Sequence, residues 1–147
     1  MIEQVDSIET VNSQQSLADA CAATLRLSGW QLKLNAPLAV SPKGSYLRAD
    51  ILAQHIDSGR RVAAYPRWQA NSGSAEEKLP FHMIKFEIAL AERPDIAERA
   101  FFVIEGRGWS WREFYLADGL SPYLAKPLRS SVVSLAEFKN LARKGLL

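Results

Sequence analysis

The chain has 147 residues, 48% of them hydrophobic, and this composition predicts one globular domain with a buried core. Its net charge of +2 is too small to indicate nucleic-acid binding by itself, and no apolar run approaches the ~20 residues that cross a bilayer, so we expect no membrane partner. The single cysteine, Cys21, excludes an internal disulfide framework and fits a reducing cytoplasm, while two histidines without a cysteine pair argue against a zinc site.

The first half of the chain predicts one helix followed by three strands. Residues 1–12 are polar and are expected to be flexible. Ser16 with Asp19 resembles a capping box, and apolar residues at helical spacing follow it up to Gly29. Alternating apolar and polar residues predict three strands, over residues 30–34, 46–56 and 60–64. Turn residues at 37–44 and 57–59 separate them.

The second half predicts two further helices and a buried strand. A helix is expected from Ala75, with Glu76 and Glu77 in its first turn, where carboxylates suit the helix dipole. Residues 99–105 predict a buried strand, and the aromatic residues of 109–116 suggest a further strand or edge segment. Ser134 predicts the start of a C-terminal helix. This order indicates an α/β fold with a mixed sheet flanked by helices, although the pattern alone also allows other mixed folds.

The most informative segment is 62–81, VAAYPRWQANSGSAEEKLPF, together with Asp50. An apolar strand leads into Trp-Gln, then a Ser-Gly-Ser turn, then a charged helix start that ends in Leu-Pro-aromatic. With the strand and turn at 102–108, FVIEGRG, this layout resembles the core of the PD-(D/E)xK nuclease superfamily, the restriction-endonuclease-like fold. The resemblance covers residues 14–116 and implies a single nuclease-like domain over 1–147, with a mixed central sheet flanked by helices.

The resemblance implies a centre with an Asp on one strand and a Glu-x-Lys motif on the next. Asp50 matches the Asp, but Tyr65 replaces the expected Glu and Arg67 stands where the Lys would be. Gln69 follows two residues later on the same strand face. The positions that match the catalytic motif are therefore Asp50, Arg67 and Gln69. The implied metal ligands are Asp50, the backbone carbonyl of Pro66, and Glu76 or Glu77.

These replacements change the chemistry that the centre can support. A neutral phenol at Tyr65 is a poor magnesium ligand. Arg67 keeps a positive charge that can bind phosphate, but it stays protonated and cannot act as a base. A centre with one carboxylate is expected to be inactive or impaired. Alternatively, Glu76, Glu77 and Lys78 on the next helix could rebuild a magnesium site, or they could simply begin the helix.

The resemblance implies double-stranded DNA as partner, magnesium as cofactor if the centre is active, and a homodimer or larger assembly. The candidate DNA-binding residues are Arg60, Arg61, Lys78, His82 and Lys85. The favoured hypothesis is a DNA-binding protein with an inactive or impaired phosphodiesterase centre. The alternatives are an active magnesium-dependent DNA endonuclease of restriction or homing type with a rearranged site, and a protein-interaction subunit without a nucleic-acid role. The sequence does not decide whether the chain is an enzyme.

Overall fold

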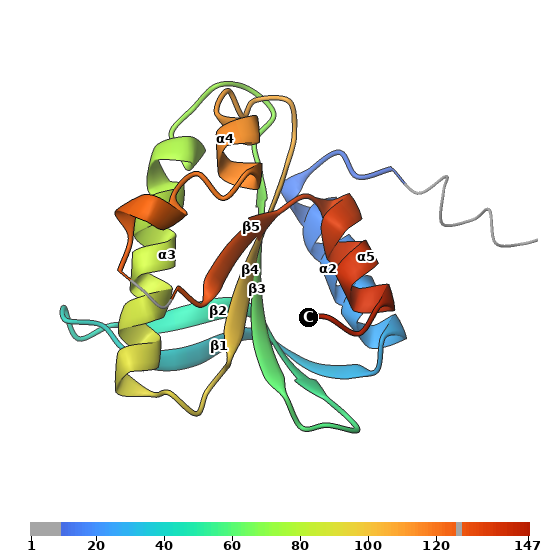
Figure 1. Ribbon diagram of the computed structural model, residues 1–147, viewed down its shortest axis with the longest axis vertical. Helices are drawn as coiled ribbons and strands as arrows, with labels where there is room; N and C mark the ends of the chain where they lie inside the picture. Colours follow the sequence, from blue (N-terminus) through green and yellow to red (C-terminus); the bar gives the residue numbers. More distant parts are fainter. Residues whose placement is uncertain (1–9, 126–127) are drawn as a thin grey trace, which may run out of the picture.

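A mixed sheet of five strands divides the computed structural model, which describes residues 10–125 and 128–147 (Figure 1). The first three strands form an antiparallel meander, and the last two continue the sheet in parallel with the third. In chain order and in sheet order the strands are β1 (Trp30–Val40), β2 (Tyr46–His55), β3 (Arg61–Trp68), β4 (Arg99–Glu105) and β5 (Ser130–Val133). The predicted α/β architecture is confirmed. Residues 1–9, which belong to the segment expected to be flexible, lie outside the described residues.

Helices cover both faces of this sheet and create two hydrophobic cores. One face carries α2 (Gln14–Leu27) and α5 (Leu135–Arg143), and the other carries α3 (Ala75–Glu92), as Figure 1 shows. The short helices α4 (Arg112–Leu116) and η1 (Ser121–Tyr123) follow β4. β4 lies between both layers, so five consecutive residues of it are buried, as is usual for a parallel strand covered on both faces.

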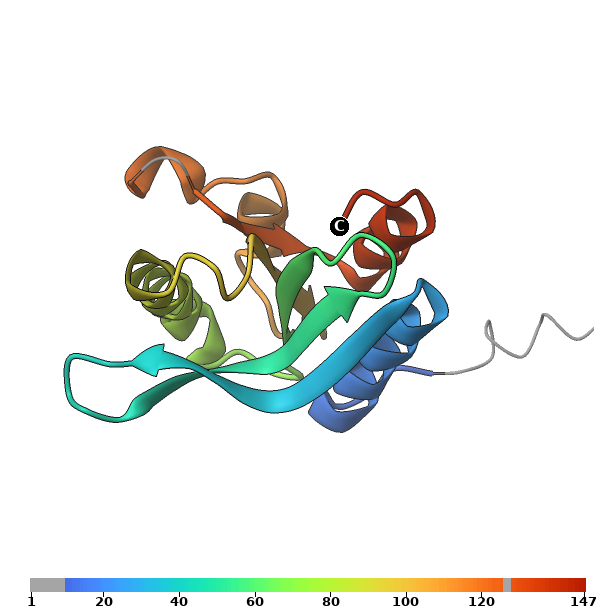
Figure 2. The ribbon, with the colours of Figure 1, turned by 90° about the horizontal axis from the view of Figure 1, so that it is seen from below.

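The hairpin of β1 and β2 is longer than the sequence pattern predicted. The expected turn at Pro37 is wrong, because β1 continues through Pro37 to Val40 and the chain reverses only between Ser41 and Ser45. β1 is an edge strand, where a proline without an N–H group can be tolerated. The pairing shifts register between Pro37 and Ala39, and the hairpin extends beneath α3 (Figure 2).

The start of α2 was predicted three residues too late. Ser13 is the N-cap, and its side chain accepts a hydrogen bond from the Ser16 N–H group, while the Ser16 hydroxyl accepts one from the Ser13 N–H group. Inside this helix, burial raises the pKa of the Cys21 thiol to about 12, so the thiol stays protonated and packs as a small apolar side chain.

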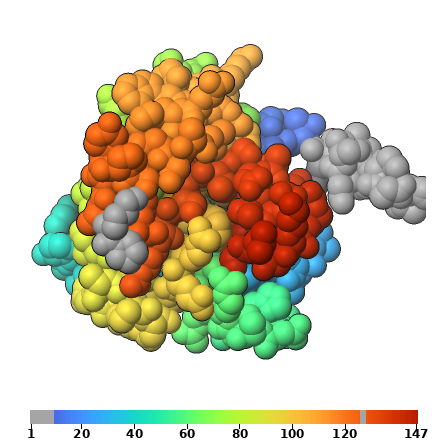
Figure 3. Space-filling model, in the orientation of Figure 1, coloured from blue at the N-terminus to red at the C-terminus, as the bar shows by residue number. Residues whose placement is uncertain are grey.

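The prediction of a strand or edge segment at 109–116 is wrong. This aromatic segment forms a loop and α4, because its side chains pack on one another and on α3 instead of pairing along a sheet. The Tyr115 hydroxyl donates a 2.6 Å hydrogen bond to the Glu76 carbonyl, which has no helical donor because Pro80 lacks an N–H group. β5 was not predicted, and its four residues complete the sheet beside β4. In the space-filling view, the C-terminal third covers most of the near face (Figure 3).

Candidate functional site

Two neighbouring strands place Asp50 and Arg67 against each other. β2 and β3 are antiparallel with Ile51 opposite Ala64, so the same register brings Asp50 beside Tyr65, and Arg67 shares the Tyr65 face of β3. Nη1 of Arg67 lies 2.5 Å from Oδ2 of Asp50. The same nitrogen donates a 2.7 Å hydrogen bond to the Pro66 carbonyl. The guanidinium therefore bridges two of the oxygens that the family motif would offer to a metal ion.

The Pro66 carbonyl has a second donor, which sequence reasoning missed. Nε2 of Gln14, at the start of α2, donates to this carbonyl at 2.9 Å, and Oε1 of Gln14 accepts from the Trp68 N–H group at 2.8 Å. Both carbonyl lone pairs are thus engaged by protein donors. A single glutamine in a polar segment gives no sequence signal of this role.

Tyr65, where the sequence resemblance implied a glutamate, is buried in an aromatic stack. Its ring stacks on Phe102 at 4.6 Å with a 7° interplanar angle, and it meets Phe86 edge-on at 6.1 Å. Burial raises the pKa of the Tyr65 phenol well above its usual range, the Asp50 charge raises it further, and Arg67 opposes both. The phenol therefore stays neutral at any physiological pH and cannot replace a carboxylate as a metal ligand.

Gln69 and Glu76 are brought to each other by the loops at the ends of β3 and β4. The Gln69 amide donates to the Gly108 carbonyl at 2.7 Å and to Oε1 of Glu76 at 3.3 Å, and its oxygen accepts from the Ala75 N–H group. The Glu76 carboxylate also accepts hydrogen bonds from the N–H and hydroxyl groups of Ser110 and from the Trp111 N–H group. None of these bonds reaches Asp50 or Arg67. We call this arrangement of Gln69, Glu76 and Ser110 the loop clamp.

The loop clamp keeps Glu76 ionised although its side chain is buried. Desolvation opposes the charged form, but hydrogen bonds from Ser110, Trp111 and Gln69 outweigh it, so the pKa of the Glu76 carboxyl lies below its usual value. Glu77, the next residue, is exposed. The two carboxylates that open α3 therefore differ completely in environment, and neither has a hydrogen bond or ion pair to Arg67 in the described residues.

Two glycines explain why the two segments that carried the family resemblance occur together. A Cβ atom at Gly106 would lie 2.3 Å from the Gln69 carbonyl oxygen, and one at Gly108 would lie 2.3 Å from that of Asn71. Gly106 also has a φ of +103°, which favours glycine. The Glu-Gly-Arg-Gly turn after β4 thus packs backbone to backbone against the chain that follows Trp68. These two glycines therefore support the loop clamp by allowing this close backbone contact.

A basic hollow of about 200 Å³ lies beside Arg67, between the β1–β2 hairpin, β3 and α3. Four of its lining residues are basic, and none of those described is acidic: Arg48, Arg67, His82 and Lys85. Nε of Arg67 donates to Nδ1 of His82 at 3.4 Å. Burial lowers the pKa of His82, and Arg67, Lys85 and Lys78 lower it further against the opposing effect of Asp50. The imidazole is therefore neutral at pH 7, with Nδ1 as the acceptor.

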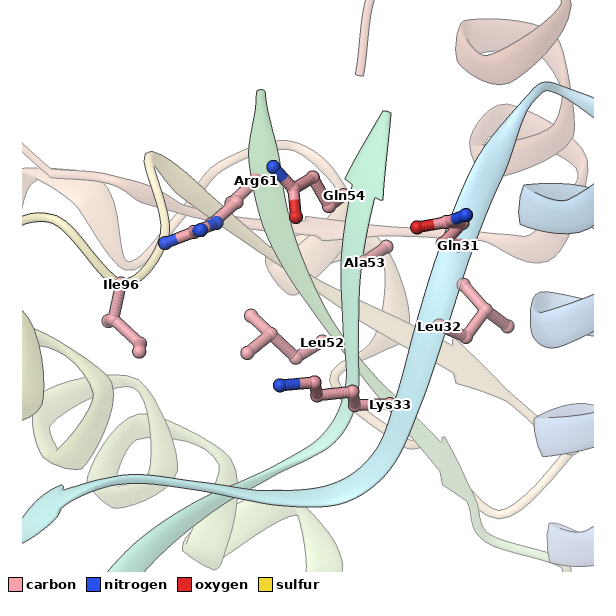
Figure 4. Close-up of a pocket in the computed structure, with 8 residues that line it drawn as sticks. All are labelled: Gln31, Leu32, Lys33, Leu52, Ala53, Gln54, Arg61 and Ile96. Carbon is pink, nitrogen blue, oxygen red and sulfur yellow. The ribbon is translucent and has the colours of Figure 1, made fainter. Parts of the chain in front are cut away.

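The structure separates the candidate DNA-binding residues into two groups. His82 and Lys85 lie at the basic hollow, and Lys78 is exposed one turn earlier on α3. Arg61 lies six residues before Arg67 on β3, which corresponds to about 20 Å along a strand. It lines a second hollow of about 220 Å³ with Lys33 and Gln54 (Figure 4). Arg60, at the same end, forms a 3.1 Å ion pair with Glu98.

Comparison with known families decides the classification. A family model described as a PD-(D/E)XK nuclease superfamily domain matches residues 12–145. The chain belongs to this superfamily. The match confirms the resemblance and extends it beyond 14–116 to include β5 and α5. No curated protein matches the chain. No helix in the described residues is long and apolar enough to cross a membrane.

PD-(D/E)XK nucleases typically use a divalent metal ion, and the residues of this member do not fit one. Within residues 10–125 and 128–147, no three His, Cys, Asp or Glu side chains are grouped so that they could hold a metal ion. Asp50 is paired with Arg67, the Pro66 carbonyl accepts two hydrogen bonds, and Tyr65 is neutral. An arginine nitrogen therefore contacts two of the oxygens that the sequence resemblance implied as metal ligands.

Proposed function

We propose that this PD-(D/E)XK superfamily member binds double-stranded DNA without cleaving it. The observation that carries the proposal is the Arg67 guanidinium, which contacts both Asp50 and the Pro66 carbonyl. A fixed side-chain cation satisfies these oxygens electrostatically but provides no open coordination position for a water or a phosphate oxygen. Arginine also cannot accept a proton at neutral pH, so it does not replace the base function of a lysine or a metal-bound hydroxide.

Retention of positive charge supports a DNA-binding role. The metal-binding carboxylate of the family is lost at position 65, but the cation at position 67 is kept, and Arg48, His82 and Lys85 lie around the same hollow. Arg61 and Lys33 add a second basic group at the other end of the same strands. Phosphates of a DNA backbone are the ligands that such separated basic groups favour.

The rearranged-site alternative requires Glu76 or Glu77 to reach Asp50. Glu76 already accepts hydrogen bonds from Ser110, Trp111 and the buried Gln69 amide, and withdrawing it would break all of these bonds. Glu77 is exposed and has no hydrogen bond or ion pair to the centre within the described residues. The geometry therefore favours a non-cleaving protein over an endonuclease with relocated ligands.

The test measures binding and cleavage on the same preparation. The wild-type chain is incubated with supercoiled plasmid and magnesium or manganese, and its binding to a labelled duplex is measured by fluorescence anisotropy at increasing salt. We expect no nicking above background and an affinity that falls as salt rises. Nicking that disappears in Asp50→Ala but persists in Glu77→Ala would overturn the proposal. Absence of both nicking and binding at low salt would instead favour a protein-interaction subunit.

A further inference from the structure

We propose that the basic hollow binds one phosphate of a nucleic-acid strand, with the adjacent unpaired or terminal base stacked on Tyr46. The inference deepens the proposed function, because it names the part of the nucleic acid that this site would hold. Its binding groups are the basic side chains and Tyr46 in a hollow that Tyr65, at the motif's carboxylate position, also lines. The family centre attracts a metal cation, whereas this hollow attracts an anion.

The charges around the hollow are unbalanced. Arg48, Arg67 and Lys85 supply positive charge among its lining residues, and Asp50, the ion-pair partner of Arg67, does not line it. Within the described residues, neither Arg48 nor Lys85 forms an ion pair. Arg48 donates to the Asn35 carbonyl at 2.9 Å, and the Lys85 ammonium lies 4.7 Å from the centre of the Phe81 ring. An entering phosphate would therefore gain charge-assisted hydrogen bonds without breaking an existing ion pair of these two residues.

His82 adds a polar group that suits a phosphate. Its imidazole is neutral and Nδ1 accepts from Arg67, so the proton is on Nε2, which is a hydrogen-bond donor. Arg67 is held in place by Asp50, Pro66 and His82, so its position is fixed before a ligand arrives. A preorganised cation loses little conformational entropy on binding, which favours a specific site over a diffuse basic surface.

Tyr46 supplies an aromatic surface at the edge of the same hollow. Tyr46 is 62% exposed, whereas its neighbour Leu47 packs against the core beneath α3. The Arg48 guanidinium lies 5.8 Å from the centre of its ring, so the ring borders the charged part of the hollow. Exposed aromatic rings beside phosphate-binding cations are the usual platforms for single-stranded bases. A base inside a duplex is already stacked on both faces, so the occupant must be unpaired or at a strand end.

Direct titration separates the two halves of this site. Binding of inorganic phosphate, thymidine 5′-monophosphate and a short single-stranded oligonucleotide is measured by calorimetry, with a blunt duplex as a fourth probe. We expect the nucleotide to bind about tenfold more tightly than phosphate, because only the nucleotide has a base to stack. Tyr46→Ala should abolish this difference, and Tyr46→Phe should retain it. Equal affinity for phosphate and nucleotide in the wild type would overturn the stacking part.

The phosphate part is tested with matched charge changes. Lys85→Gln and Arg48→Gln should each weaken phosphate and nucleotide binding by about tenfold. Lys139→Gln removes the same charge from α5, on the opposite face of the sheet, and should leave the affinity unchanged. If Lys85→Gln and Lys139→Gln behave alike, phosphate binding is non-specific and the proposal fails. Thermal unfolding of each variant confirms that it is folded.

The two proposals can fail independently. Nucleotide binding that needs Lys85 and Tyr46, without any affinity for the blunt duplex, would support this site and contradict duplex binding by the chain. Salt-sensitive duplex binding that is unaffected by Tyr46→Ala, Arg48→Gln and Lys85→Gln would support duplex binding by the chain and contradict this site.

Discussion

Arg67 determines what the centre can do, because it occupies the space between Asp50 and the Pro66 carbonyl. The centre also has a tyrosine at position 65, where the resemblance implied a metal-binding glutamate. We therefore expect Tyr65→Glu combined with Arg67→Lys to create magnesium binding, which we do not expect of the wild type. A glutamate there would replace a ring packed between Phe86 and Phe102, so the free energy of unfolding should fall by about 3 kcal/mol.

Thermal unfolding measures this outcome without relying on cleavage. Magnesium should raise the midpoint of the double variant, because an ion that binds only the folded state stabilises it, and should not raise that of the wild type. The matched control is Tyr65→Gln with Arg67→Lys, which has the same shape without the carboxylate. If magnesium stabilises both double variants equally, position 65 does not act as a ligand and the simple two-residue account is wrong.

The loop clamp connects the first turn of α3 to the loops that follow β3 and β4. Glu76, in the first turn of α3, accepts hydrogen bonds from Ser110 and Trp111 in the loop after β4, and Gln69, in the loop after β3, donates to Gly108 in that same loop. We expect Glu76→Gln to lower the free energy of unfolding by about 3 kcal/mol at pH 7, because the new amide would point N–H groups at existing donors. Urea denaturation measures the difference. Glu77→Gln, on the exposed side of the same turn, should change it by less than about 0.5 kcal/mol.

Acid should remove the contribution of Glu76. Its carboxyl has a lowered pKa in the folded protein, so its stabilisation is fully present above the unfolded pKa of about 4.3 and is lost as the pH falls through the lower folded value. The wild type and Glu76→Gln should therefore differ most near neutral pH and converge in strong acid. A difference that stays constant down to pH 2 would show that the carboxylate charge is not responsible.

Sequence periodicity was sufficient for elements whose signal is local. The hairpin turn at 57–59, the start of α3 at Ala75 and the bounds of β4 were predicted because turn residues, helix-start carboxylates and a continuous apolar run are short-range features. The segment at 109–116 was mistaken for a strand because its aromatic residues owe their conformation to α3 and Glu76, which are distant in sequence. The pairing of Asp50 with Arg67 was likewise not predicted, since it depends on the register between β2 and β3.

The whole molecule carries basic groups at two ends of one sheet face. Arg61 with Lys33 lies at one end and Arg67 with Arg48 and Lys85 at the other, about 20 Å apart along β3. Alternation places Arg61 and Arg67 on the same side of that strand. Since α3 covers the apolar middle of this face, a nucleic acid that contacts both ends would pass along the edge of the domain and would not enter it.

Charge changes at the two ends should therefore weaken duplex binding independently. We expect Arg61→Gln and Lys85→Gln each to reduce the slope of log affinity against log salt by about one, and their effects on the binding free energy to add in the double variant, because the sites are too far apart to share a phosphate. Fluorescence anisotropy over a salt series measures both quantities. Lys139→Gln serves as the control, since it removes one positive charge from the other face. A double variant no weaker than Lys85→Gln alone would show that the duplex contacts only the end of the sheet that contains Arg67.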